Sequence, residues 1–265
     1  MTKQVLVTGG TGRLGRPTAR RLREASRDVR VLTRRRRETA DAVEYVVGDL
    51  STAEGLQAAV DGVAAIVHCA TSTRGDVEAT RQLVRAASRA GTPHPVYVSI
   101  VGLDHIASWG YPRAKRACER MVAESGLPWT ILRATQLYDY CLVNIRRLAR
   151  PPVPLVPAGF HVKPVDPDEV AARLVELALG EPAGRAPDIA GPLVTSWADL
   201  LHDYLRASHR RRWVMPVRIP GARAVREGAL LPGPGHTTGS RTWRQFLTEK
   251  LRQPQAESIR EVRSA

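Results

Sequence analysis

The fold of this chain is decided near its start by Val5-Leu6-Val7-Thr8-Gly9-Gly10-Thr11-Gly12-Arg13-Leu14-Gly15. An apolar run ends at a cluster of glycines, and a helical pattern follows over Arg16–Ala25. Gly10, Gly12 and Gly15 fit G-x-G-x-x-G, and Gly9, Gly12 and Gly15 fit its three-spaced variant. Such glycines allow a tight turn, the approach of phosphate to the backbone, and close packing of helix on strand. The stretch therefore predicts a strand, turn and helix start that hold a dinucleotide pyrophosphate on free N–H groups.

Apolar runs and amphipathic helical patterns alternate along the first two thirds of the chain. Runs such as Ala64-Ala65-Ile66-Val67 are apolar at every position, as in parallel strands that are covered on both faces. The predicted strands are Gln4–Thr8, Val29–Thr33, Val43–Val47, Ala64–Cys69, Pro95–Ser99 and Trp129–Leu132. The predicted helices are Arg16–Ala25, Thr52–Val60, Asp76–Ala90, Ala114–Ser125, Asp166–Leu179, Ser196–Ala207 and Thr242–Arg252.

This alternation predicts an α/β fold with a Rossmann-like, doubly wound parallel sheet, because β-α-β units place helices on both faces. Ligands of such sheets bind beyond the carboxyl ends of the strands. We expect an NADP(H)-binding core over residues 1–133 and a smaller substrate cap, integrated with this core, over residues 134–252. Residues 218–240, rich in Gly and Pro, read as a loop region, and residues 253–265 as a flexible tail.

The composition limits the classes of function. The 265-residue chain has no apolar run long enough to span a bilayer and no signal-like start, so we expect a cytoplasmic protein without a membrane partner. Its three cysteines show no metal-ligand spacing and no disulfide framework. The net charge of +14 comes with no helix-turn-helix, zinc or aromatic-interleaved basic motif. We therefore expect a solvated arginine-rich surface, no nucleic-acid partner, no metal, and a monomer or homodimer.

Arginine follows the second predicted strand at Thr33-Arg34, where sites that prefer NAD carry an acid on the ribose hydroxyls. A guanidinium group binds a 2′-phosphate instead, and Arg13 in the glycine turn is placed to reach the same phosphate. The alternative is that Arg34–Arg37 form only a charged loop. We predict NADP(H) as the cofactor, bound by Gly9, Gly10, Thr11, Gly12, Arg13, Leu14, Gly15, Arg34, Asp49, Leu50, Cys69, Ala70, Thr71 and Lys115.

Asp49 and His68 lie at the ends of the third and fourth predicted strands. The Asp49 carboxylate can accept a hydrogen bond from an adenine amino group; the alternative is that it caps a helix near Ser51-Thr52. The small residues Cys69-Ala70-Thr71 leave room for the cofactor ribose and diphosphate. His68 by itself reads as a packed or hydrogen-bonded core residue.

Tyr111 and Lys115 form the pattern Y-x-x-x-K, whose spacing of four places both side chains on one face of a helix. An ammonium group beside a phenol favours the phenolate, so Tyr111 is the expected proton donor to a carbonyl oxygen. Ser99, at the end of the fifth predicted strand, is placed to hydrogen-bond the same oxygen. Pro112 indicates a helix start here and disfavours helical backbone at Tyr111.

Five stretches together resemble the short-chain dehydrogenase/reductase superfamily and, more narrowly, its NmrA-like branch: Thr8–Gly15, Gly48-Asp49-Leu50, Ser99–Gly102, Tyr111–Lys115 and Gly126–Gln136. The resemblance implies a Rossmann fold, NADP(H) binding and reduction of ketones or alkenes. It also implies that Tyr111 is the general acid, that Lys115 holds the nicotinamide ribose, and that Ser99 orients the substrate. The chain departs from the superfamily in its short Ser99-to-Tyr111 gap and in His68-Cys69-Ala70-Thr71.

The leading hypothesis is an NADPH-dependent oxidoreductase for a small or medium-sized organic carbonyl or conjugated substrate. We expect this substrate to contact Val101, Gln136, Tyr138 and Tyr140, although Tyr138, Tyr140 and Phe160 are equally compatible with a core role. Two alternatives stay open. One is an NADP(H)-sensing regulatory protein that docks on a partner, and the other is an epimerase or dehydratase with a recycled cofactor.

Overall fold

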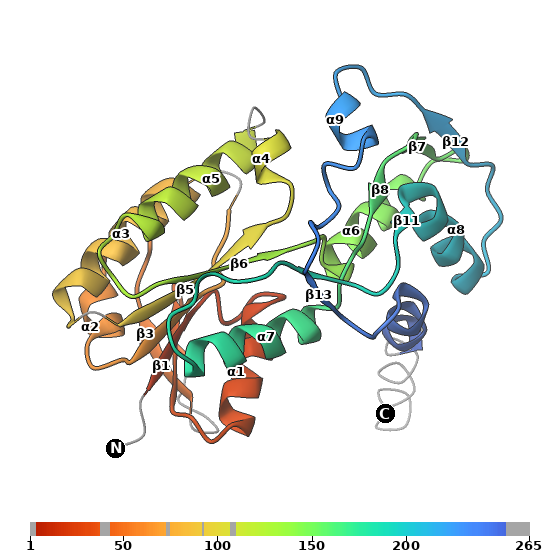
Figure 1. The fold of residues 1–265 in the computed structure, drawn as a ribbon. Coiled ribbons are helices and arrows are strands. Elements are labelled where there is room, and N and C mark those ends of the chain that lie inside the picture. Colours follow the sequence, from red (N-terminus) through yellow and green to blue (C-terminus); the bar gives the residue numbers. More distant parts are fainter. Residues whose placement is uncertain (1–3, 38–42, 73–74, 92, 107–109, 253–265) are drawn as a thin grey trace, which may run out of the picture. The chain divides into compact units, whose positions relative to one another are not determined.

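The glycine-rich turn joins β1 (Val5–Thr8) to α1 (Gly15–Glu24) in a computed structural model that describes residues 4–37, 43–72, 75–91, 93–106 and 110–252 (Figure 1). All four residues of β1 are buried. The turn is so tight that a Cβ on Gly15 would lie 2.1 Å from the carbonyl oxygen of Gly9, and Gly9 itself has a φ of +66°. Only glycine fits these positions, because any side chain would push the helix off the strand.

Six parallel strands follow the predicted pattern and form the centre of the sheet. They are β1, β2 (Val29–Thr33), β3 (Val43–Val47), β4 (Ala65–His68), β5 (His94–Ile100) and β6 (Thr130–Ala134). A two-residue strand, β9 (Gly184–Arg185), pairs in parallel with β6. Among the strands of residues 1–134 and 167–188 the order is β9-β6-β5-β4-β1-β2-β3. The direction in which successive strands are added to the sheet reverses between β1 and β4. Ligands of doubly wound sheets bind at this switch point.

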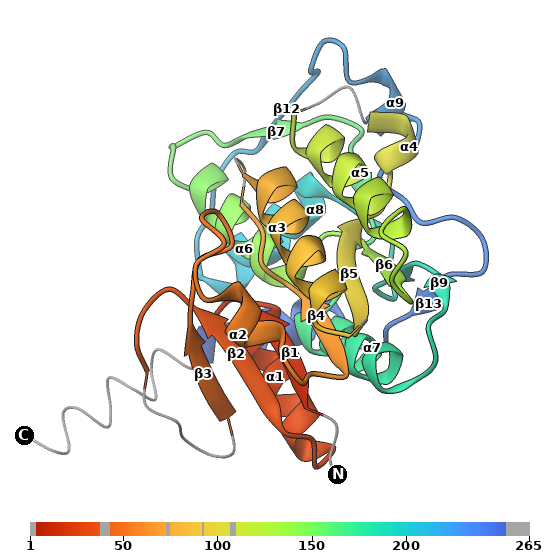
Figure 2. The same cartoon turned by 90° about the vertical axis from the view of Figure 1, so that its left-hand side faces the viewer.

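Helices cover both faces of this sheet (Figures 1 and 2). One face carries α2 (Leu56–Val60), α3 (Asp76–Arg89) and α5 (Gly110–Ala123); the other carries α1 and α7 (Pro167–Leu179). A short helix, α4 (Leu103–Ile106), precedes α5. Side chains of the sheet interlock with α2 and α3 in a buried apolar cluster that includes Leu6, Leu32, Leu56, Ile66 and Leu83. The predicted Rossmann-like α/β fold is confirmed.

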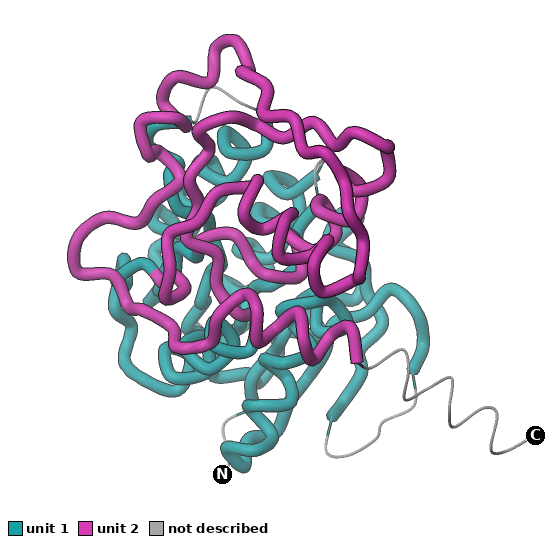
Figure 3. Tube along the Cα trace, turned by 90° about the vertical axis from the view of Figure 1, so that its right-hand side faces the viewer, with its two compact units in different colours: residues 1–134, 167–188 teal, residues 135–166, 189–265 magenta. Residues whose placement is uncertain are grey.

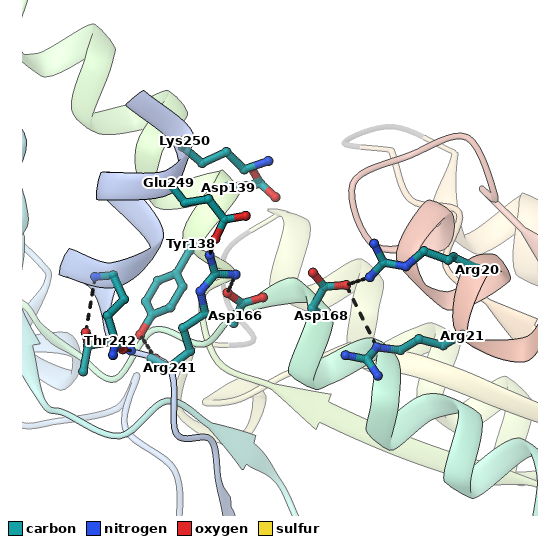
Figure 4. A network of polar contacts seen from close by, with 11 residues as sticks. Arg20, Arg21, Tyr138, Asp139, Asp166, Asp168, Arg241, Thr242, Glu249 and Lys250 are labelled. Carbon is teal, nitrogen blue, oxygen red and sulfur yellow. Dashed lines mark hydrogen bonds and ion pairs between the residues drawn. The ribbon is translucent and has the colours of Figure 1, made fainter. Parts of the chain in front are cut away.

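The chain divides into two compact units, shown in two colours in Figure 3. Unit 1 contains residues 1–134 and 167–188, and unit 2 contains residues 135–166 and 189–265. The expected division after residue 133 differs from this one, because α7 belongs to unit 1. Two observations explain the difference. Val170 and Leu174 of α7 are fully buried, and Asp168 in its first turn pairs with Arg20 of α1 at 2.5 Å (Figure 4).

Unit 2 has a core of its own, built on α6 (Tyr138–Leu148), α8 (Trp197–Ala207) and a helix over 243–252. Tyr138, Trp243 and Phe246 pack with ring centroids 5.2 to 5.6 Å apart. A capping box between Ser196 and Asp199 begins α8. The strands of unit 2 form three short pairs: β7 (Leu155–Pro157) with β12 (Met215–Val217), β8 (His161–Val162) with β11 (Thr195–Ser196), and β10 (Ile189–Ala190) with β13 (Thr237–Thr238).

Several elements differ from the sequence prediction. Helix α2 begins four residues later than expected, because Gly55 before it has a φ of +68° and cannot continue a right-handed helix. Helix α5 includes Tyr111, since a proline in the first turn of a helix removes no hydrogen bond. Helices α4, α6 and α9 (Arg223–Arg226) and the short strands were not predicted. The residues expected as a loop region, 218–240, contain α9 and β13, and the expected tail lies outside the described residues.

Replacing Gly15 by alanine tests the close approach in the turn. Gly15→Ala is expected to lower the free energy of unfolding by about 1–3 kcal/mol, because the new Cβ overlaps the Gly9 carbonyl. Gly233→Ala is the control, since a Cβ there meets nothing within 4 Å. It is expected to change stability by less than about 0.5 kcal/mol. Denaturant unfolding measures both, and equal losses would contradict the steric role of Gly15.

Candidate functional site

The glycine turn lies at the carboxyl end of β1 and has the geometry of an anion-binding cradle. A Cβ on Gly9 would lie 2.7 Å from the backbone nitrogen of Ala70, and one on Gly10 would lie 2.7 Å from a methyl group of Val31. The N-terminus of α1 has no side-chain cap and no acidic residue in its first turn. Its N–H groups and positive dipole end are therefore free of competing carboxylates, and the residues present fit a pyrophosphate.

The turn residues expected to contact the cofactor fall into two groups. Thr11, Gly12 and Arg13 are exposed, so a ligand can reach them. Leu14 is buried and packs below the turn. The loop itself is held by a hydrogen bond from the Gly12 N–H to the Gly9 carbonyl at 2.8 Å. The exposed part of the loop is therefore the part that faces outward from the sheet edge.

Arg34 and Asp49 lie after neighbouring strands of the same edge. Arg34 is exposed directly after β2. Asp49 Oδ1 accepts hydrogen bonds from the Ser51 N–H at 2.7 Å and the Ser51 hydroxyl at 2.6 Å, but it does not cap α2, whose N-cap is Gly55. These bonds, with a smaller contribution from the charge of Arg34, hold the pKa of Asp49 below its ordinary value. Leu50 is half-buried against the core.

His68 and Cys69 end β4, and the surroundings of both are core-like. His68 is buried, with Nδ1 2.6 Å from Thr8 Oγ1 and Nε2 3.4 Å from Thr80 Oγ1. Burial, reinforced by the charge of Lys115, lowers the pKa of His68 to about 3. Burial also raises the pKa of the Cys69 thiol to about 12. Near neutral pH the imidazole is therefore uncharged and the thiol protonated, so neither is suited to acid–base or nucleophilic work.

Tyr111 and Lys115 share one face of α5, as predicted from their spacing. The Tyr111 hydroxyl lies 3.1 Å from Thr71 Oγ1, in the loop after β4. The Lys115 ammonium lies 5.8 Å from the centroid of the Tyr111 ring. Thr71 donates its single hydroxyl hydrogen to Asp76 Oδ2 at 2.8 Å, so Tyr111 must be the donor in its own bond to Thr71. The result is a directed chain of hydrogen bonds from Tyr111 through Thr71 to Asp76.

Asp76, which sequence reasoning did not assign to the site, is the buried counter-ion of Lys115. Lys115 is 4% exposed, and its Nζ lies 3.4 Å from Asp76 Oδ2. The ammonium also donates to the Tyr97 hydroxyl at 3.1 Å and to the Val98 carbonyl at 3.3 Å. The two hydrogen bonds use two of its three donors, and Asp76 is its ion-pair partner. The only sequence signal at Asp76 was an acidic residue at a helix start, which is common enough to be explained by the helix dipole alone.

Ser99 and Val101 lie beside this cluster at the end of β5. Ser99 is 1% exposed, and its Oγ has no hydrogen-bond partner among the described residues. A buried hydroxyl without a partner costs roughly 1–3 kcal/mol, which a ligand oxygen can recover. Val101 is buried, and its N–H donates to the Ala134 carbonyl at 3.0 Å. Its side chain is therefore part of the wall of unit 1 rather than an exposed contact.

A buried arginine holds α4 and α5 against the sheet. Arg133 of β6 binds Glu119 of α5 through two hydrogen bonds of 2.6 and 2.7 Å, and Asp104 of α4 at 2.7 Å. These hydrogen bonds, with the two negative charges, outweigh burial and raise the pKa of Arg133. Tyr111 and Lys115 are thus carried on a helix that is anchored at its far end by a bidentate ion pair.

The substrate residues expected in unit 2 are only partly supported by the structure. Tyr138 is 2% exposed, and its hydroxyl donates to the Arg241 carbonyl at 2.8 Å (Figure 4). The prediction of Tyr138 as a substrate contact is therefore wrong, because the ring is needed to fill the core of unit 2, and Phe160 is buried as well. Tyr140 is 51% exposed beside Trp197, and Gln136 has a buried Oε1 with no partner among the described residues.

Three general features of the described residues complete the picture. No helix among them is both long and apolar enough to cross a bilayer. Within the same residues no cluster of His, Cys, Asp and Glu side chains has the arrangement of a metal site. Cys69, Cys118 and Cys141 are free thiols.

The chain belongs to the NAD(P)H-binding family, whose pattern it matches over residues 9–177. It is 32% identical over 200 residues to a (4-alkanoyl-5-oxo-2,5-dihydrofuran-3-yl)methyl phosphate reductase of Streptomyces griseus, covering 71% of this chain and 68% of the relative. It is 26% identical over 235 residues to an NAD(P)H azoreductase of Xenophilus azovorans, covering 86% and 82%. It spans only 22% of an uncharacterized Mycobacterium tuberculosis protein, to which it is 27% identical over 199 residues.

Solved structures share the fold at low identity. The NADPH-dependent quinone oxidoreductase QOR2 of Escherichia coli, complexed with NADPH, has a TM-score of 0.77 and 18% identity over 93% of this chain and 99% of that one. A nucleoside-diphosphate-sugar epimerase of Staphylococcus aureus has the same TM-score with 17% identity over 94% and 100%. Because a reductase and an epimerase fit equally well, the likeness shows the fold and not the reaction.

The buried imidazole of His68 predicts a pH dependence of stability. Its pKa is about 3 in the folded chain and about 6.5 when unfolded, so only the unfolded state takes up the proton between these values. Stability is therefore expected to fall as the pH drops from about 6.5 to about 3, by up to about 1.4 kcal/mol per pH unit from this residue. His68→Gln should show a flatter profile of unfolding free energy against pH.

His202→Gln, which changes an exposed histidine of α8, is the matched control for this measurement. It should give a profile parallel to that of the wild type. If His68→Gln also runs parallel to the wild type, the imidazole does not stay neutral in the folded chain.

Proposed function

We propose that this protein is an NADPH-dependent oxidoreductase that reduces a small or medium-sized organic carbonyl or conjugated substrate. The observation that carries the proposal is the Tyr111 phenol, which lies beside the buried Lys115 ammonium in the unit that contains the glycine turn. Membership of the NAD(P)H-binding family supports the cofactor class. The names of the Streptomyces and Xenophilus relatives, a furanone phosphate reductase and an azoreductase, support reduction as the reaction type.

The cofactor side of the proposal assigns NADP(H) to the glycine turn and the loops beside it. The pyrophosphate belongs on the turn 9–15, and the exposed guanidinium groups of Arg34 and Arg13 suit a 2′-phosphate. Asp49 keeps Oδ2 for the adenine amino group, since its hydrogen bonds from Ser51 use only Oδ1. The small residues Cys69 and Ala70 leave room for the ribose and diphosphate that lie between the adenine and the nicotinamide. When bound, NADPH supplies the hydride for the reduction.

The proton side assigns the transfer to Tyr111. Its hydroxyl donates to Thr71 in this structure, and a substrate oxygen would take the place of that acceptor. Tyr111 gives its proton to the oxygen as the neighbouring carbon is reduced, so a carbonyl becomes an alcohol. The positive charge of Lys115 stabilises the phenolate that is left behind. A ribose hydroxyl would bond Lys115 through the N–H that its hydrogen bonds to Tyr97 and Val98 do not use.

Ser99 and the residues of unit 2 complete the proposed substrate contacts. The Ser99 hydroxyl lacks a partner and would hydrogen-bond the substrate oxygen, which fixes the carbonyl in line with the proton donor. Gln136 and Tyr140 remain candidates for substrate contacts in unit 2, and Tyr138 does not. The role of unit 2 as a substrate cap and the narrower NmrA-like relationship belong to this proposal too.

Replacing Tyr111 by phenylalanine tests the proton donor. The wild-type protein should oxidise NADPH in the presence of at least one member of a panel of quinones, ketones and enals. Tyr111→Phe should lower that turnover by about 10²–10⁴-fold while NADPH binding changes little, because only the hydroxyl is lost. Tyr45→Phe, at a half-buried tyrosine of β3, is the control and should lower the turnover much less.

Two results would remove this mechanism. Equal turnover by Tyr111→Phe and the wild type would exclude Tyr111 as the proton donor. Tight NADPH binding by the wild type with no turnover of any panel member would favour the NADP(H)-sensing alternative.

Replacing Arg34 by alanine tests the choice of cofactor. Arg34→Ala should weaken NADPH binding by about 1.5–3 kcal/mol, because a charge-assisted hydrogen bond to the 2′-phosphate is lost. NADH binding should change little, since NADH has no such phosphate. Arg89→Ala, at an exposed arginine ending α3, is the charge-matched control. Calorimetric titration with both cofactors measures the difference, and equal weakening of the two would contradict the assignment.

A further inference from the structure

An exposed apolar surface lies in unit 2 on the strand pair β7 and β12, which run side by side (Figure 1). The register pairs Leu155 with Met215, so their side chains emerge next to one another on the same face. Both are half exposed, at 51% and 52%. Trp213, two residues before Met215, is 88% exposed, and Val153, two residues before Leu155, is 42% exposed. Soluble surfaces seldom gather four large apolar side chains in this way without a partner.

Buried residues of the same two segments explain how this strand pair is held to unit 2. Val156 is fully buried in the core of unit 2, and Val214 packs against that core. Val156 and Val214 therefore hold this strand pair to the protein, while Leu155 and Met215 stay exposed. The outward side chains are not needed for the core, so their apolar character requires another explanation.

Basic residues flank the apolar face, and acidic residues are absent from the segments that form it. Arg210, Arg211 and Arg212 directly precede Trp213, Arg218 follows β12, and Arg150 precedes Val153; all five are exposed. No Asp or Glu occurs between residues 140 and 165 or between 204 and 226. Among the described residues, none of these five arginines forms an ion pair. The surface is thus complementary to a partner that is both anionic and apolar.

We propose that this surface, formed by Val153, Leu155, Trp213 and Met215 with Arg150, Arg210–Arg212 and Arg218, docks on a bilayer that contains anionic phospholipids. Exposed tryptophan favours the depth of the lipid headgroups, and aliphatic side chains favour the acyl boundary just below it. The arginines bind headgroup phosphates at the same depth. A nucleic acid would satisfy the arginines and Trp213 but not Val153, Leu155 and Met215, so the aliphatic side chains favour lipid.

This proposal departs from the expectation, drawn from the composition, that the protein has no membrane partner. No described helix is suited to span a bilayer, but peripheral docking needs only a surface of this kind. The inference is independent of the reductase proposal, because all of its residues lie in unit 2 and none belongs to the Tyr111 cluster.

Sedimentation of the full chain with lipid vesicles tests the docking surface. The protein should bind vesicles of phosphatidylglycerol mixed with phosphatidylcholine and should bind phosphatidylcholine vesicles weakly. Arg210→Gln, Arg211→Gln and Arg212→Gln together should lower the partition coefficient about a hundredfold, since each basic residue near an anionic surface contributes roughly a factor of five. Trp213→Ala should lower it roughly tenfold, and Trp213→Phe should lower it less.

A triple variant of equal charge, Arg35→Gln, Arg36→Gln and Arg37→Gln, is the matched control, because it removes exposed arginines of unit 1. Its partition coefficient should change by less than about threefold. An equal loss in both triple variants would show unspecific attraction and overturn the proposal. Absence of vesicle binding also overturns it. In that case, binding of duplex DNA that depends on Trp213 would indicate a nucleic-acid surface, and a dimer that dissociates in Trp213→Ala would indicate a second copy.

Discussion

The buried ion pair between Lys115 and Asp76 is the constraint on which the candidate site depends. A charge at this depth needs a full set of partners, because leaving one unpaired costs about 3–5 kcal/mol. Lys115 finds them in Asp76, the Tyr97 hydroxyl and the Val98 carbonyl. The start of α3, one face of α5 and the end of β5 are therefore held together by a single ammonium group. Tyr111 takes its position from this arrangement.

The second constraint is the absence of side chains in the glycine turn. Gly15 and Gly9 bring α1 close to β1, and no other residue fits the observed separation. The turn leaves a helix start without a cap or an acidic neighbour at the edge where Asp76 and Lys115 lie buried within unit 1. One edge of the sheet thus combines N–H donors for phosphate with a phenol that donates a hydrogen bond. Burial keeps His68 and Cys69 uncharged beside them, which supports the proposed assignment of the proton transfer to Tyr111.

Much of unit 1 was predictable because its signals are local. The six central strands are short apolar runs, and α1, α3 and α7 have clear periodicity and charged first or last turns. The elements that were missed lack such signals. Helix α6 has no side-chain cap, and the strands of unit 2 are two or three residues long. Tyr138 illustrates the difficulty, since an aromatic residue has the same sequence signature whether it lines a site or fills a core.

The amino-acid sequence was sufficient to predict the glycine turn and the alternation of the six central strands with helices. It was also sufficient to identify the charged and phenolic groups at the ends of those strands. Glycine spacing, apolar runs and a Y-x-x-x-K pattern each act over a few residues, so a linear chain displays them. Three facts could be found only in the tertiary structure. Asp76 is the counter-ion of Lys115, and α7 belongs to unit 1. Tyr138 is buried in the core, whereas Trp213 is exposed. These facts depend on which residues, distant from one another in the sequence, are buried together. Packing sets this, and the neighbours of a residue in the sequence do not.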